Sequence, residues 1–438
     1  MSDKYNHSVF LDSEKCKGCT TCLKRCPTEA IRIRDGHAVI NSTRCIDCGE
    51  CIRVCAYKAK KASHDDLSVI KKFKYTVALP APSLYGQFNN LEDIGNVLDG
   101  LIKLGFDEVY EVARAAELVS AYTRMYINRE KVKKPVISSA CPVISRIISM
   151  NYPDLCENIL PMLPPIDIAA YLAREKVRSE HPEFSDEEVG IIFISPCPAK
   201  VSYIKNGFAG ARNYIDATVS VRDIYFALLD IMEKNCSEKS EIPQTESGRV
   251  GISWASTGGE ATAIYNRHYL AADGIENCIK VLNQIDNSDI KDIDFVELNA
   301  CSGGCVGGAM TVENPYIAQA RLQTLKADLL IKTINAQEWI PDCYFNENTV
   351  TYNPYILLSE DRKTALRMMS DIEKIHSTLP HLDCGSCGAP TCMSFAEDIV
   401  KGEATLSDCT VIMKDIFKKY IECGKDAEAL EQILNQKQ

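Results

Sequence analysis

The chain has 438 residues, which corresponds to about three domains of ordinary size. Its hydrophobic content of 46% and charged content of 25% exclude a disordered or fibrous chain. The net charge of −11 argues against nucleic-acid binding, and neither a signal peptide nor a membrane-spanning apolar run is present in the sequence. We therefore expect a cytoplasmic protein that binds no nucleic acid and no membrane.

The 21 cysteines are too dilute for a small disulfide scaffold, and in the cytoplasm clustered cysteines more often bind metal. Sixteen of them fall into groups, which equals four sets of the four thiolates that a cubane iron–sulfur cluster takes. So many thiolates are an oxidation liability and indicate an anaerobic organism. The remaining five are expected to be buried free thiols: Cys156, Cys236, Cys278, Cys343 and Cys423.

The first segment carries the run Cys-x2-Cys-x2-Cys-x3-Cys twice. In such runs three cysteines wrap one cluster and the fourth binds the other. Residues 8–60 resemble a bacterial two-cluster ferredoxin, which carries electrons one at a time, and two zinc sites are the alternative. We predict a small α+β domain over residues 1–74. The ligands would be Cys16, Cys19, Cys22 and Cys55 for the first cluster, and Cys26, Cys45, Cys48 and Cys51 for the second.

The middle of the chain alternates short apolar runs with helix-like periodic stretches, which predicts an α/β domain with mostly parallel strands over residues 75–371. The predicted helices include 91–104 and 108–127, and the predicted strands are 75–80, 135–139, 189–195, 249–254 and 293–299. Ligands bind at the carboxyl ends of parallel strands. Cys141, Cys197 and Cys301 follow such strand ends and should therefore converge on one site, where Cys305 of a glycine-rich loop would join them. Taken alone, these four cysteines could bind either zinc or an iron–sulfur cluster.

Three motifs then occur in order: Ser138-Ser-Ala-Cys-Pro142, Ser195-Pro-Cys-Pro-Ala-Lys200 and Glu297-x3-Cys301-x3-Cys305-x-Gly-Gly308. With them, residues 75–345 resemble the iron-only (FeFe) hydrogenases. The active site of that family, the H-cluster, is a cubane joined through one cysteine to a two-iron subcluster with CO, CN⁻ and a dithiolate bridge. The resemblance implies interconversion of H2 with protons and electrons, a redox partner such as a ferredoxin, and maturation proteins that insert the two-iron unit.

The resemblance also implies roles for individual residues. Cys141, Cys197 and Cys301 would hold the cubane, and Cys305 would join it to the two-iron unit. Lys200 would donate a charge-assisted hydrogen bond to one cyanide. Trp254 takes the place of an aromatic residue over the site, and the segment that would bind the other cyanide is Ala81, Pro82 and Ser83.

The sequence departs from catalytic members of the family at four positions. Ala140 replaces the cysteine whose thiol shuttles protons, Ser195 and Asn299 replace methionines, and Tyr203 replaces a glutamate. A positioned proton donor contributes about 10²–10⁴-fold in rate. We therefore expect low H2 turnover, as in the H2-sensing branch of the family, with a separate signalling partner protein.

Two alternatives stay open. The chain could be an efficient hydrogenase with another proton relay, through Glu117, Tyr203 or Ser195. It could instead be a non-enzymatic iron–sulfur scaffold without the two-iron unit. Lys200 and the intact third motif favour a hydrogenase, since a scaffold has no cyanide to bind.

The last segment, residues 372–438, is predicted to be a small helical domain with a helix at 395–404. Its pattern Cys-x2-Cys-x4-Cys-x16-Cys resembles a known small 4Fe–4S domain, with zinc as the alternative metal and Cys423 as an alternative fourth ligand. It would supply an electron port or a redox-dependent surface. The chain would then hold three accessory 4Fe–4S clusters and the H-cluster, and this last cluster would be bound by Cys384, Cys387, Cys392 and Cys409.

Overall fold

The computed structural model describes residues 6–207, 214–235, 243–290, 292–332, 339–346, 349–354 and 358–422. It forms two compact units. The first unit comprises residues 1–10, 45–53 and 60–354, and the second comprises residues 11–44, 54–59 and 355–438. The division into domains 1–74, 75–371 and 372–438 stays a prediction.

The first unit is built on two sheets whose described strand pairs all run parallel. This confirms the predicted α/β class. The order of the larger sheet is β6 (Glu108–Val109), β5 (Tyr75–Pro80), β8 (Val189–Ser195) and β9 (Ala217–Ser220). The order of the smaller sheet is β10 (Tyr269–Asp273), β11 (Phe295–Asn299) and β7 (Val136–Ile137).

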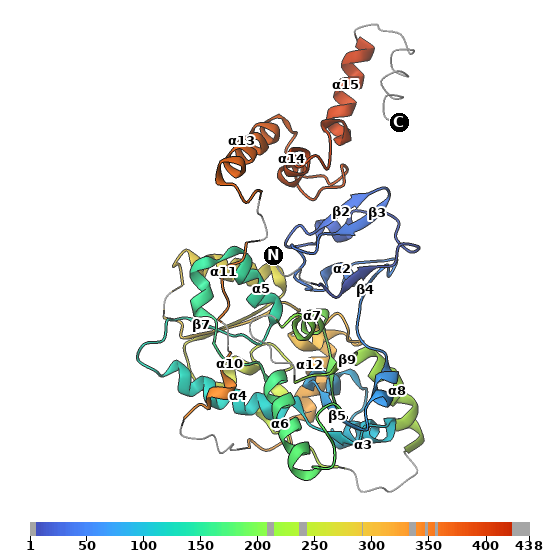
Figure 1. Cartoon of the computed structure of the whole chain (residues 1–438), viewed down its shortest axis with the longest axis vertical. Coiled ribbons are helices and arrows are strands. Elements are labelled where there is room, and N and C mark those ends of the chain that lie inside the picture. The colour runs from blue at the N-terminus through green and yellow to red at the C-terminus, as the bar shows by residue number, and fades with distance from the viewer. Residues whose placement is uncertain are drawn as a thin grey trace. The chain divides into compact units, whose positions relative to one another are not determined.

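Helices cover both faces of the larger sheet (Figure 1). Ile191 and Phe193 of β8 pack in the core that contains α4 (Val112–Ile127) and α6 (Pro165–Glu180). Ile192 and Ile194 pack in the core that contains α3 (Gly95–Leu104) and α8 (Val221–Asn235). Because both faces are buried, β8 is a continuous apolar run rather than an alternating one, which is why the sequence predicts its bounds so well.

Two helices of the first unit begin directly after a candidate ligand. Pro142 opens α5 (Pro142–Asn151) and Pro198 opens α7 (Pro198–Asn206), and each follows a cysteine. Proline suits the first helical position because its missing N–H has no partner there anyway. The other described helical elements of this unit are α2 (Glu50–Arg53), η1 (Leu67–Lys72), η2 (Pro82–Gln87), η3 (Pro153–Asn158), α9 (Arg249–Ser253), α10 (Gly259–Ala263), α11 (Ile275–Asp286), η5 (Cys305–Gly307), α12 (Pro315–Leu325) and η6 (Asp342–Tyr344). Strand β1 (Val9–Leu11) pairs with β4 (Lys60–Ala62).

The strand predicted at residues 249–254 is wrong, because residues 249–253 form the helix α9 and Trp254 follows it. Its glycines let α9 approach α4 closely: a Cβ on Gly251 would lie 2.1 Å from the carbonyl oxygen of Ala113. The backbone N–H groups of Gly248 and Gly251 both donate to the carboxylate of Glu117. A short apolar run does not distinguish a strand from a buried helix, and these contacts favour the helix.

The other predicted elements differ mainly in length. The runs at 75–80 and 189–195 coincide with β5 and β8, and those at 135–139 and 293–299 contain the shorter β7 and β11. The stretch 91–104 contains α3. The stretch 108–127 starts with β6 before α4. The sequence patterns do not predict strands β9 and β10.

The second unit contains the antiparallel hairpin of β2 (Ile31–Arg34) and β3 (His37–Ile40), preceded by the short helix α1 (Thr21–Lys24). Its C-terminal part is helical, as predicted, around a small core that includes Ile372, Leu379 and Phe395. The helix expected at 395–404 lies earlier, at 392–400, because Thr391 caps its first turn. The helical elements of this part are α13 (Arg362–Thr378), α14 (Cys392–Val400), η7 (Leu406–Asp408) and α15 (Thr410–Glu422) (Figure 1).

The five ungrouped cysteines differ in burial. Cys278 is fully buried, as predicted, whereas Cys156 and Cys343 are only partly buried. Cys236 and Cys423 lie outside the described residues, and with Cys423 lies the alternative ligand set of the last cluster. None of the helices that the structure describes is both long and apolar enough to cross a membrane.

Candidate functional site

Four cysteines of the first unit converge, but from two sheets rather than from one. Cys141 and Cys301 follow β7 and β11 of the smaller sheet, Cys197 follows β8 of the larger one, and Cys305 opens η5. Burial raises the pKa of Cys197 to about 12, and the neighbouring thiols add to this shift. Burial and neighbouring sulfurs likewise raise the pKa of Cys301 and Cys305. Thiolates crowded in this way need a bound cation, because metal ligation requires deprotonated sulfur.

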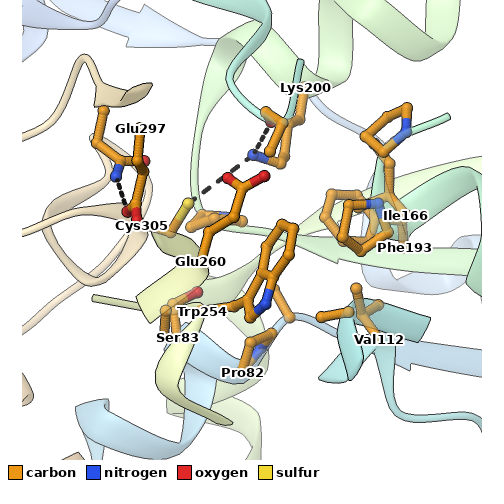
Figure 2. Close-up of a pocket in the computed structure, with 18 residues that line it drawn as sticks. Pro82, Ser83, Val112, Ile166, Phe193, Lys200, Trp254, Glu260, Glu297 and Cys305 are labelled. Carbon is orange, nitrogen blue, oxygen red and sulfur yellow. Dashed lines mark hydrogen bonds between the residues drawn. The ribbon is translucent and has the colours of Figure 1, made fainter. Parts of the chain in front are cut away.

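Lys200 lies in the first turn of α7 and is almost completely buried. Its Nζ is 3.9 Å from Sγ of Cys305 and 3.4 Å from the carbonyl oxygen of Ala140 (Figure 2). Burial opposes the charge of this amine, but the sulfurs of Cys305, Cys197 and Cys141 hold its pKa above the ordinary value. The site therefore keeps a protonated lysine beside Cys305.

A cavity lies next to Cys305 and Lys200. Its walls include the apolar side chains of Val112, Ile166 and Phe193 (Figure 2). Eight of the residues that the sequence singled out line this cavity, and they come from segments far apart in the chain: Ala81, Pro82, Ser83, Ala140, Lys200, Trp254, Asn299 and Cys305.

Ser83 provides a test of whether an H-cluster fits. Its side chain is fully buried, lines the cavity and has no hydrogen-bond partner for its hydroxyl among the described residues. An orphaned buried hydroxyl is costly unless a ligand pairs with it. A cyanide-bearing two-iron unit would supply that acceptor, and Lys200 would face a second cyanide. The residues present fit the group.

Trp254 presents its indole to the cavity (Figure 2). It stands at the end of α9 rather than after a strand. Its Nε1 donates to the hydroxyl of Ser120 on α4 at 2.9 Å, which fixes the orientation of the ring.

Two buried carboxyl groups at the cavity are the main residues that sequence reasoning missed. Glu260 accepts a hydrogen bond from Ser138 at 2.6 Å. Glu297 accepts from the backbone N–H groups of Gly258 and Ala261 and from the amide of Asn299. Burial raises the pKa of both carboxyls, and together with the charge of Glu297 it raises the pKa of Glu260 to about 8, so Glu260 retains its proton near neutral pH. The only sequence signal was Glu297 itself, which served as a motif marker.

Three residues considered for an alternative relay do not line the cavity. The Ser195 hydroxyl donates to the carbonyl of Cys197 at 2.9 Å and so shapes the ligand loop. The Tyr203 hydroxyl donates to Asp167 at 2.5 Å. Glu117 is occupied by the glycine N–H groups of α9.

Arg53 is a further residue that the sequence did not indicate. Its Nη2 donates to Sγ of Cys301 at 2.8 Å and to the carbonyl of Gly307 at 3.0 Å. Its Nη1 donates to the carbonyl of Cys48 and to the carboxylate of Glu50. The same guanidinium thus contacts the loop of a predicted accessory-cluster ligand and a predicted cubane ligand.

The remaining predicted ligands divide between the units. Cys45, Cys48 and Cys51 belong to the first unit, while Cys26 and the four ligands predicted for the first cluster belong to the second. Within the second unit, one cavity is lined by all four C-terminal cysteines: Cys384, Cys387, Cys392 and Cys409.

Comparison with known families agrees with this arrangement, which is that of an iron–sulfur protein with a thiolate-lined cofactor pocket. The model of the iron-only hydrogenase large subunit, C-terminal domain, matches residues 74–271 and 265–309. The chain belongs to the iron-only hydrogenase family. A 4Fe–4S dicluster domain model matches residues 8–56, and an Fe–S cluster model matches residues 379–411. The predicted family and both iron–sulfur modules are confirmed.

Individual relatives are distant. The chain is 23% identical over 436 residues to iron hydrogenase 1 of Clostridium pasteurianum, covering 81% of this chain and 73% of that protein. It is 42% identical over 84 residues to one component of the ion-translocating oxidoreductase complex of Rhodobacter capsulatus, covering 18% of this chain and 45% of that component. Among solved structures it is similar to FeFe-hydrogenase HydA1 from Chlamydomonas reinhardtii, with a TM-score of 0.43, 17% identity and coverage of 59% and 86% of the two chains.

Proposed function

We propose that this protein interconverts H2 with two protons and two electrons at low turnover, and that it serves in H2 sensing or redox regulation. The observation that carries the hydrogenase part is the placement of Lys200 and the unpartnered hydroxyl of Ser83 at one cavity beside Cys305. A protonated amine and a free hydroxyl are the two donors that a dicyano two-iron unit requires.

When bound, the H-cluster supplies the metal chemistry that cleaves or forms H2. In this proposal Cys141, Cys197, Cys301 and Cys305 would hold the H-cluster, with Cys305 as the ligand beside the two-iron unit. Lys200 and Ser83 bind and orient the cyanides. The apolar wall keeps water away from the reacting centre, which strengthens the charge-assisted hydrogen bond of Lys200.

In this proposal the turnover of H2 is low because the chain lacks the thiol that supplies protons to the two-iron unit. The methyl group of Ala140 lines the cavity where a catalytic relative carries a thiol, and it cannot carry a proton. Glu260 is a candidate donor, since its raised pKa lets it hold a proton and it lines the same cavity. A less well-placed donor forfeits part of the roughly 10²–10⁴-fold that general acid catalysis contributes.

Electrons would pass through three accessory 4Fe–4S clusters to a redox partner such as a ferredoxin, and the signal would pass to a separate protein. Maturation proteins would insert the two-iron unit. A second candidate function, an efficient hydrogenase with a relay other than cysteine, is favoured by the buried pair of Glu260 and Glu297 at the cavity.

The test is infrared spectroscopy on the chain produced with hydrogenase maturation proteins. Bands of CO and CN⁻ are expected, and their absence after successful maturation of a control hydrogenase would overturn the proposal in favour of a scaffold. Lys200→Met should shift or remove the CN⁻ bands. Lys205→Met, near the end of the same helix, should leave them unchanged. A turnover assay then separates the sensor from the efficient enzyme.

A further inference from the structure

The second unit brings two iron–sulfur ligand loops into contact. Helix α1 carries Cys22, and Leu23 and Lys24 follow it. Gly385, directly after Cys384, lies against this helix: a Cβ built on it would be 3.0 Å from Cε of Lys24 and 3.3 Å from Cδ2 of Leu23. The residues that adjoin one ligand of each predicted cluster therefore pack so closely that a side chain at position 385 would crowd Lys24 and Leu23.

Lys24 forms hydrogen bonds that stabilise the packing of α1 against the C-terminal ligand loop. Its Nζ donates to the carbonyl oxygen of Pro390 at 2.8 Å and also to that of Asp383. Asp383 directly precedes Cys384, and Pro390 stands between Cys387 and Cys392. One lysine of the N-terminal segment thus binds two points of the C-terminal ligand loop.

Ion pairs around buried carboxylates stabilise the rest of this interface. Asp398 of α14 is almost fully buried, and it accepts hydrogen bonds from Arg32 at 2.7 and 3.0 Å and from Arg34 at 2.6 Å. Nearby, Arg44 pairs with Glu397. The removal of one partner from a buried pair is strongly destabilising, so the contact is a fixed feature of the unit.

The backbone adds a further constraint. The N–H of Ile33 in β2 donates to the carbonyl of Gly388 at 2.9 Å. A Cβ on Gly388 would lie 2.2 Å from the carbonyl oxygen of Ile33, and the φ of Gly388 is +81°. A side chain at position 388 would separate the C-terminal loop from the hairpin, so the loop approaches this closely only with glycine there.

We propose that the C-terminal 4Fe–4S cluster exchanges electrons directly with the first N-terminal cluster through the contact of Gly385 with Leu23. One electron leaves the cluster bound by the C-terminal cysteines, which is oxidised by one unit, and enters the cluster of Cys16, Cys19, Cys22 and Cys55, which is reduced by one unit. No proton or bond is transferred. The external donor is a low-potential one-electron carrier protein, and electrons from H2 would travel the other way. The C-terminal module is then a second point at which electrons enter or leave the chain, and this role does not depend on the rate of H2 turnover.

Electron paramagnetic resonance tests this in the full-length chain with its clusters reconstituted. The signal of the reduced C-terminal cluster should be broadened and should relax faster when the first cluster is also reduced and paramagnetic. In Cys19→Ala, which removes a ligand of the first cluster, this enhancement should disappear. If the relaxation of the C-terminal signal is the same in both proteins, the clusters are not neighbours and the proposal fails.

A second measurement avoids reliance on a variant that loses a cluster. The unaltered chain is poised at potentials where one or both of these clusters are reduced, and the coupling should appear only when both are. Rapid photoreduction then gives the rate of electron transfer between them. Lys24→Met should slow this transfer, whereas Lys17→Met, in the same ligand loop but outside the contact, should not. Equal rates in the two variants would contradict the role of the contact.

Discussion

Arg53 donates a hydrogen bond from Nη2 to the sulfur of Cys301 at 2.8 Å. Hydrogen bonds to ligand sulfurs and nearby positive charge stabilise the reduced, more negative state of an iron–sulfur cluster. Arg53→Met should therefore lower the reduction potential of the cubane for which we propose Cys301 as a ligand. A redox titration followed by infrared and paramagnetic resonance spectroscopy measures that potential.

The controls for Arg53 separate charge from structure. Arg53→Lys keeps the positive charge and should restore part of the potential. Lys103→Met removes a cation of α3 that pairs with Asp99 and should leave the potential unchanged. A cubane potential that is the same in Arg53→Met as in the unaltered chain would show that the contact does not tune the cluster.

Ala140→Cys should raise the rate of proton reduction. Ala140 lines the cavity beside Cys305, so a thiol there would stand at the site where a proton is consumed. We expect a gain of up to about 10²–10⁴-fold, measured as H2 evolution per matured enzyme. Ala140→Ser offers a smaller and much less acidic group and should give less. An unchanged rate in Ala140→Cys would mean that the missing thiol does not limit this protein.

Glu260→Gln should reduce H2 turnover while the fold is retained. Glutamine can still accept the hydrogen bond of Ser138, but it cannot release a proton. The loss should be at most about 10²–10⁴-fold. Glu276→Gln, exposed at the start of α11, should have no effect.

The pH profile of proton reduction adds a second readout for the same pair. Because burial and the charge of Glu297 raise the pKa of Glu260 to about 8, Glu260 is protonated below and at neutral pH and loses its proton as the pH rises through that value. Proton reduction should therefore decline across that alkaline limb. Glu260→Gln should move or remove the limb, and a profile that is identical to that of the unaltered chain would exclude Glu260 as proton donor.

Asp398→Ala should destabilise the second unit by about 3 kcal/mol or less, because it removes the buried carboxylate that pairs with Arg32 and Arg34, whereas both arginines keep part of their side chains in water. Urea unfolding followed by the loss of iron–sulfur absorbance measures this. Asp371→Ala removes an exposed partner of Lys374 on α13 and should cost about 1 kcal/mol or less. Equal stability of the two variants would contradict the importance of the buried network.

Much of the fold was predictable where burial alone determines the pattern. Strands β5 and β8 lie between two helical layers, so their sequences are continuously apolar and their bounds follow from the sequence. The run at 249–254 is also apolar, but it is helical because Gly248 and Gly251 bind Glu117 of α4. That contact depends on the tertiary structure, and a local pattern does not contain it.

The candidate site likewise depends partly on tertiary contacts that a local sequence pattern does not contain. The cysteines of the first and last segments could be grouped from their spacing, because those ligand loops are local in sequence, whereas Cys141, Cys197 and Cys301 could be grouped only through the strand ends that they follow. Glu260 and Arg53 could not be found in this way. Glu260 meets Ser138 across 122 residues, and Arg53 meets Cys301 across 248 residues. Arg53 stands inside the second cysteine run and Glu260 in no such pattern, but nothing in the sequence indicates the partner of either residue, which only the folded chain identifies.

The pairing of Arg32 with Asp398 also has a consequence for the synthesis of the protein. The two residues are separated by 366 positions. At a ribosomal rate of about 5–20 residues per second, the hairpin of β2 and β3 waits about 20–70 s before its acidic partner has been made. During that interval Arg32 and Arg34 lack the carboxylate that later buries them. The N-terminal cluster region is therefore among the first parts of the chain to be synthesised and among the last to be completed.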